Sequence, residues 1–137
     1  MRLVVDTNVL VSALLNKTSK AALLLDAWER RLFDVATCQE QLDEFTRVTR
    51  YPKLSRHIAA ADADSLRDQL KDVAIFFEKL PAVTASPDPD DNWLLGLAEA
   101  AQADYLVSGD KSGVLMLAVH RNTRIITLSG MLDLLSG

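Results

Sequence analysis

The sequence predicts an α/β fold in which a mostly parallel sheet is covered by helices on both faces. The run Leu3-Val4-Val5 is wholly apolar, as expected of a strand that is buried on both sides in a parallel sheet. Short apolar runs of this kind alternate with amphipathic helical stripes along the chain, which favours right-handed βαβ units. A length of 137 residues suits one domain, covering residues 1–137.

Five strands are expected, at residues 3–5, 32–37, 81–84, 104–107 and 124–128. Asp6 follows the first of them directly. A carboxylate therefore stands at the carboxyl end of a buried strand, where open α/β sheets bind their ligands. The third strand is short because Pro81 begins it.

Helices are expected between these strands, and several have a recognisable first residue. Ser19 and Ser129 are suitable N-caps, and Asp88 followed by Pro89 is the sharpest helix start in the chain. Apolar stripes and helix-breaking residues assign the helices to residues 9–15, 20–32, 38–50, 59–78, 89–102, 114–119 and 130–135.

Composition and charge describe an ordinary globular protein. The formal net charge of −4 argues against a strongly basic nucleic-acid-binding protein but leaves room for a local basic face. Cys38 is the only cysteine, so an intramolecular disulfide is impossible and a reducing cytoplasm is expected. No apolar run reaches the roughly 20 residues of a membrane span, and Asp6 interrupts the N-terminal run too early for a signal peptide.

Four acidic residues are the candidate catalytic groups. Asp6 and Asp110 follow strands, and Asp91 lies in the first turn of a helix that starts at the same edge of the sheet. Parallel topology brings such positions together, and Glu44, in the helix after the second strand, can reach the same edge. Asp90 is the rival of Asp91 for the third position.

Carboxylates gathered in this way repel one another unless a cation lies between them. An all-oxygen ligand set suits Mg²⁺ or Mn²⁺ far better than Zn²⁺. Such an ion activates water and neutralises the charge that develops on a phosphate. The chain shows neither a glycine-rich phosphate loop nor a Ser/His or Cys/His nucleophile pair, so metal-assisted hydrolysis is the chemistry that its residues support.

Each of these acids also has a purely structural explanation. Asp6 could cap the next helix, Asp91 could belong to a capping box, and Asp110 could be a plain turn residue. Glu44 could be an exposed helix acid that pairs with Arg47 one turn later. The presence of all four at one predicted edge favours the functional interpretation.

Basic and aromatic residues give a weaker signal. Arg47, Arg50 and Lys53, continued by Arg56, form the densest basic run and could contact phosphates, with a solvated helix end as the equal alternative. Trp28 and Trp93 are assigned to the core or an interface rather than to base stacking, and Cys38 is assigned to the interior.

The motifs stand in a recognisable order. The chain opens with Asp6-Thr7-Asn8-Val9-Leu10, and Glu44 is followed by Val48 and by Arg50-Tyr51-Pro52-Lys53. Asp91-Asn92 and then residues 103–110, Ala-Asp-Tyr-Leu-Val-Ser-Gly-Asp, complete the series. Together they resemble the acidic positions of PIN-domain ribonucleases, in particular those of the VapC-like branch, and the resemblance spans nearly the whole chain.

The resemblance implies a three-layer α/β/α sandwich with a mostly parallel five-stranded sheet. It also implies a Mg²⁺- or Mn²⁺-dependent endoribonuclease, commonly the toxin of a type II toxin–antitoxin pair. An RNA substrate, an antitoxin partner, a homodimer and a cytoplasmic location are expected on the same ground, without a membrane. The metal-binding and catalytic set would be Asp6, Glu44, Asp91 and Asp110, supported by Asn8 and Ser108, with RNA-phosphate contacts from Arg47, Arg50 and Lys53.

Two other functions stay open at this point. One is a Mg²⁺-binding regulatory or phosphoacceptor α/β domain, and the other is a degenerate PIN-like fold that acts by protein binding. Asp6 stands alone at its strand end and Glu44 has no role in a phosphoacceptor site, so the nuclease is favoured. Similar proteins usually carry a further acid where this chain has Lys111-Ser112-Gly113, which leaves open whether one or two ions bind.

Overall fold

The protein is built on a six-stranded sheet with the strand order β3-β2-β1-β4-β6-β5. The computed structural model describes residues 1–109 and 113–137. Within these ranges every strand pair is parallel except β5 with β6. The strands are β1 (Arg2–Val5), β2 (Asp34–Cys38), β3 (Ile75–Phe77), β4 (Tyr105–Val107), β5 (Val119–His120) and β6 (Thr123–Ile126).

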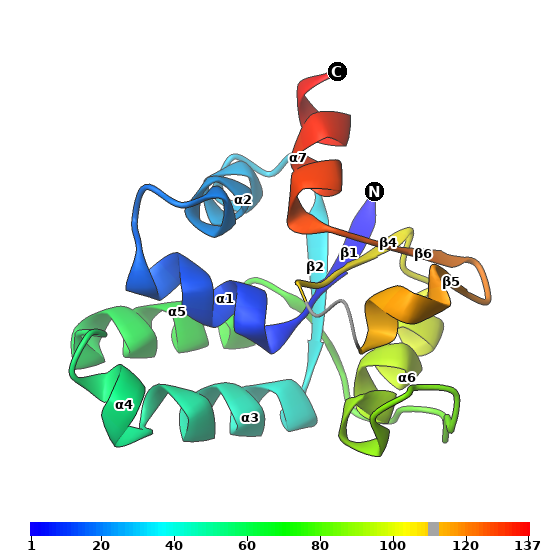
Figure 1. Cartoon of the computed structure of the whole chain (residues 1–137), viewed down its shortest axis with the longest axis horizontal. Helices are drawn as coiled ribbons and strands as arrows, with labels where there is room; N and C mark the ends of the chain where they lie inside the picture. The colour runs from blue at the N-terminus through cyan, green and yellow to red at the C-terminus, as the bar shows by residue number, and fades with distance from the viewer. Residues whose placement is uncertain (110–112) are drawn as a thin grey trace.

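Helices cover both faces of the sheet, with α6 on one side and α1, α3 and α5 on the other (Figure 1). None of the described helices combines the length and the hydrophobicity that crossing a membrane requires. The α-helices are α1 (Thr7–Leu15), α2 (Lys20–Glu29), α3 (Gln39–Thr49), α4 (Pro52–Ser55), α5 (Ala60–Asp72), α6 (Asn92–Ala101) and α7 (Leu128–Ser136), and the short 3₁₀ helices are η1 (Pro89–Asp91) and η2 (Val114–Leu117).

The two faces of the sheet carry separate cores because side chains alternate along each strand. Leu3 and Val5 of β1 face α1, α2 and α3, whereas Val4, between them, faces α6. All three side chains are at most 1% exposed. The apolar run that begins the chain is therefore buried on both sides, which confirms the predicted three-layer α/β/α sandwich.

The strand order reverses direction between β1 and β4. From β1 the chain moves through β2 to β3, whereas β4 pairs with the opposite edge of β1 and continues to β6. Such a reversal point leaves a crevice at the carboxyl ends of the strands. Asp6 and Ser108, the first residues after β1 and β4, lie at this point.

The third predicted strand, at residues 81–84, is wrong. The third strand is β3, and the helix expected to run to residue 78 ends at Asp72. Ile75-Phe76-Phe77 pairs with β2 because aromatic and β-branched side chains suit a strand, although Phe77 also continues the apolar stripe of the preceding helix. The segment at 81–84 packs on α6 instead, where a Cβ on Gly96 would stand 2.9 Å from the carbonyl oxygen of Pro81.

The C-terminal part also differs from the prediction. The helix expected at residues 114–119 is the 3₁₀ helix η2 followed by β5, which adds a sixth strand to the predicted five. The cap of the last helix is Thr127 and not Ser129, since the Thr127 hydroxyl accepts the N–H of Gly130 at 3.0 Å. The other predicted caps, Ser19 and Asp88, are confirmed by side-chain hydrogen bonds to Ala22 and Asp90.

Candidate active site

Asp6 is held at the end of β1 by hydrogen bonds to both of its carboxylate oxygens. Oδ1 accepts the backbone N–H of Asn8 at 3.3 Å, and Oδ2 accepts the hydroxyl of Ser108 at 2.9 Å. Its own N–H donates to the carbonyl of Val107 at 2.9 Å, and its side chain is only 7% exposed. Asp6 therefore caps α1, which agrees with its purely structural explanation. It is also held by Ser108, the first residue after the neighbouring strand β4.

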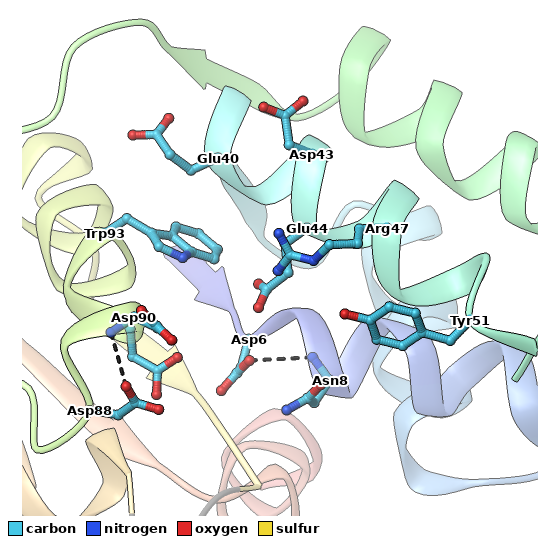
Figure 2. A pocket seen from close by; sticks show the side chains of 11 residues that line it. Asp6, Asn8, Glu40, Asp43, Glu44, Arg47, Tyr51, Asp88, Asp90 and Trp93 are labelled. Atoms are coloured by element: carbon cyan, nitrogen blue, oxygen red, sulfur yellow. Dashed lines mark hydrogen bonds between the residues drawn. The ribbon is translucent and has the colours of Figure 1, made fainter. Parts of the chain in front are cut away.

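Glu44 comes from the middle of α3, and its carboxylate points toward Asp6 (Figure 2). The side chain is half-buried. No ion pair joins the two described residues Glu44 and Arg47, so the structural explanation for Glu44 is not realised. Both side chains instead line the same hollow beside Asp6.

Gln41 fixes the helix that carries Glu44, a role that was not predicted from the sequence. Its side chain is fully buried, donates to the carbonyl of Val5 at 2.6 Å and accepts the hydroxyl of Thr37 at 2.7 Å. These bonds join α3 to the ends of β1 and β2. The residue bonded in β1, Val5, directly precedes Asp6. A detectable signal was a polar residue four positions before Phe45, on the inward face of the helix.

A second group of acids enters from η1 and the start of α6. Asp88 caps η1, accepting the N–H of Asp90 at 3.0 Å, and Pro89 occupies its first turn. Asp90 is exposed, whereas Asp91 is half-buried and its side chain makes no capping hydrogen bond to α6. Asp90 and Asp91 both face the same hollow as Asp6, so the choice between them stays a prediction.

One cleft of about 740 Å³ collects these side chains (Figure 2). Seven carboxylates line it, and Arg47 is the only cation among the described residues around it. The cleft is therefore strongly negative, although the whole chain carries a net charge of only −4. Its lining residues are Asp6, Asn8, Glu40, Asp43, Glu44, Arg47, Tyr51, Asp88, Asp90, Asp91 and Trp93.

Two of the remaining predicted site residues belong to the cleft, and two lie beyond it. Asn8 lines the cleft. Ser108 is not a lining residue, but its hydroxyl donates a hydrogen bond to Asp6, which is one. Arg50 and Lys53 are exposed and are not among its lining residues. Asp110, and with it the Lys111-Ser112 part of the departure from similar proteins, lies outside the described residues.

The two tryptophans have different environments. Trp28 is 4% exposed in the core between the sheet and the helices, which confirms its assignment. Trp93, the second residue of α6, packs partly against the other core, and it also lines the cleft. Trp93 therefore fits its assignment to the core or an interface only in part, because it also borders the cleft.

The donor groups of the cleft suit a hard divalent cation, because they are carboxylate oxygens with no described histidine or cysteine among them. Asp6 is already oriented by two donors, as ligands of a metal usually are. Within the described part of the chain, no three acidic, histidine or cysteine side chains are close enough to bind an ion as they stand. The donor atoms of the site therefore fit a metal ion. The fourth predicted acidic ligand, Asp110, lies outside the described residues.

Comparison with known proteins supports the interpretation of this edge of the sheet. A family model described as the PIN domain matches residues 2–112, which is most of the chain and includes every acidic residue discussed above. The chain belongs to the PIN-domain family. PIN domains are generally nucleases and typically use divalent metal ions, so the coarse function is hydrolysis of nucleic acid. Neither a curated protein nor a solved structure matches the chain.

Proposed function

We propose that this PIN-domain protein is a Mg²⁺- or Mn²⁺-dependent endoribonuclease. The observation that carries the proposal is the crowding of seven carboxylates around one cleft that contains a single described cation. Carboxylates at this density repel one another, and a divalent ion relieves the repulsion. The acidic set of the proposal is Asp6, Glu44, Asp91 and Asp110.

The chain's own residues prepare the site for hydrolysis of a phosphodiester. Asp6 would hold the ion from the end of β1, with Glu44 and Asp91 facing it from the two walls of the cleft. Ser108 and the N–H of Asn8 keep the Asp6 carboxylate in one orientation. A bound ion supplies a water of lowered pKa and neutralises the charge that develops when a P–O bond of the phosphate breaks.

Arg47 is the proposed phosphate contact inside the cleft. Within the described part of the chain its guanidinium makes neither an ion pair nor a hydrogen bond, so its donors are available to a ligand. A guanidinium binds phosphate oxygens in a bidentate manner. Arg50 and Lys53 are exposed beyond the cleft, and we assign them to flanking phosphates of the same strand.

A toxin role is the finer part of the proposal and rests on the resemblance to VapC-like proteins. With it we propose an antitoxin protein that covers the cleft, a homodimer and a cytoplasmic location. A short adjoining gene for a DNA-binding protein with an extended tail would support the toxin role. Its absence would count against that role and leave the proposed chemistry unchanged.

The decisive experiment follows cleavage of a labelled RNA by the purified full chain. We expect cleavage with Mg²⁺ or Mn²⁺, none with EDTA, and a loss of at least about 100-fold in kcat for Asp6→Asn, Asp91→Asn and Asp110→Asn, because each removes a charged ligand. Asp68→Asn, on the exposed face of α5, is the matched control and should cleave as the parent does.

The same assay separates the competing functions. Metal binding without cleavage of RNA would favour a regulatory or phosphoacceptor domain. Neither metal binding nor cleavage would favour a fold retained for protein binding. Unchanged cleavage by all three acidic variants would show that the active site has been misassigned.

A further inference from the structure

Two aromatic side chains stand on opposite sides of the acidic cleft. Tyr51 reaches into it from the junction of α3 and α4, and Trp93 reaches into it from the start of α6 (Figure 2). The carboxylates of Asp6 and Glu44 lie between the two rings. The rings therefore flank the position that the proposed function gives to the scissile phosphate.

Packing within the core does not explain the placement of Tyr51. Its side chain is 47% exposed, and within the described part of the chain it has no hydrogen bond. Pro52 begins α4 directly after it and restricts Tyr51 to an extended backbone, with φ −59° and ψ 132°. The backbone thus holds an exposed aromatic ring at the wall of the cleft.

Trp93 is anchored more firmly. One side of the residue packs against the core beneath α6, and the residue also borders the cleft, so its ring is half-buried and supported from behind. A supported indole loses little conformational freedom when a second flat group stacks on it. Leu94, the next residue, is fully buried, which fixes the start of α6 beneath the ring.

The charge of the cleft explains why stacking is needed. Seven carboxylates repel an RNA backbone, and Arg47 is the single described cation among the lining residues. Attraction to phosphates alone therefore gives little affinity. Aromatic faces stack on any nucleobase without opposing the negative charge, and each stacked base contributes substantially to binding of single strands.

We propose that Tyr51 and Trp93 stack on the unpaired nucleobases that flank the scissile phosphate. This inference rests on the proposed ribonuclease function and adds how the substrate is held. Bases within a duplex are already stacked on each other and are not available to the two rings. Single-stranded segments should accordingly bind in preference to the same sequence in a duplex.

The test uses the full chain, Ca²⁺ in place of the activating ion, and fluorescein-labelled oligoadenylate as the probe. We expect Tyr51→Leu and Trp93→Leu each to weaken binding by about 5- to 150-fold, the loss of one stacked base. Tyr51→Phe and Trp93→Phe, which keep an aromatic face, should retain most of the affinity. Phe76→Leu, at an exposed aromatic residue on β3 outside the cleft, is the matched control and should bind as the parent does.

An abasic ribose-phosphate oligomer of the same length distinguishes stacking from other effects of the substitutions. It carries the same phosphates, so the leucine variants should bind it as well as the parent does. Equal losses on both oligomers, or unchanged binding of oligoadenylate by both leucine variants, would overturn the inference while RNA cleavage by the parent still stood. Absence of metal-dependent cleavage by the parent would instead remove the proposed function on which the inference rests.

Discussion

Cys38 lies at the junction of β2 and α3, where its side chain is fully buried. Removal from water raises the pKa of this thiol from 9.0 to about 12, opposed in part by the hydrogen bond from the backbone of Gln41. The folded protein therefore keeps the proton at a pH where the unfolded chain has lost it. This contribution to stability is complete below the unfolded pKa and is lost as the pH rises toward the folded one.

We expect the free energy of unfolding of the parent to fall more steeply than that of Cys38→Ala between pH 9 and about 12. The difference in slope should approach about 1.4 kcal/mol per pH unit. Denaturant unfolding of both proteins across this range measures it. The cavity left by the variant lowers its stability at every pH and does not alter the comparison of slopes, whereas parallel pH profiles would contradict the buried, neutral thiol.

At the scale of one element, the position of α3 depends on the bonds that Gln41 makes to Val5 and Thr37. Gln41→Leu leaves a buried carbonyl and a buried hydroxyl without their partner, which costs about 1–3 kcal/mol for each group. Because Glu44 is on the same helix, we also expect kcat for RNA cleavage to fall by about 10- to 100-fold through misplacement of its carboxylate. Cleavage kinetics and thermal unfolding measure the two effects.

Two variants separate positioning from stability. Thr37→Val combined with Gln41→Leu removes the orphaned hydroxyl and should regain part of the lost stability without regaining kcat. Thr49→Val, which removes a buried hydroxyl bonded to the carbonyl of Phe45 further along α3, should lower stability and leave kcat unchanged. A fall in kcat that follows stability in all three variants would make Gln41 a structural residue only.

The elements also show what a single sequence can reveal. Asp88, Pro89 and Ser19 marked their helix starts correctly, because capping is a local interaction between neighbouring residues. The strand Ile75–Phe77 was missed because Phe77 also continues the apolar stripe of the preceding helix, and pairing with β2 decides between the two structures. Gln41 was missed because its partner Val5 is 36 residues away in the sequence.

The whole molecule distributes charge in a way that its composition conceals. A net charge of −4 suggests a mildly acidic surface, yet seven of the 19 acidic residues line one cleft. The sequence predicted three of the seven, Asp6, Glu44 and Asp91, and offered Asp90 as the rival of Asp91. Glu40, Asp43 and Asp88 complete the set because the turns of α3 and η1 bring them to the same hollow, which requires the folded chain.

This concentration of charge predicts how the intact protein responds to divalent ions. An ion that binds only the folded state stabilises it by RT ln(1 + [ion]/Kd), about 2.7 kcal/mol at a hundredfold excess over Kd. Thermal unfolding should therefore shift upward with MnCl₂ and much less with NaCl at equal ionic strength, since screening alone relieves only part of the repulsion. Asp6→Asn and Asp91→Asn should reduce the MnCl₂ shift, whereas Asp68→Asn, outside the cleft, should preserve it. Equal shifts with both salts would mean that the ions act by screening alone. A full MnCl₂ shift in both cleft variants would mean that the ion binds elsewhere, whatever the protein does to RNA.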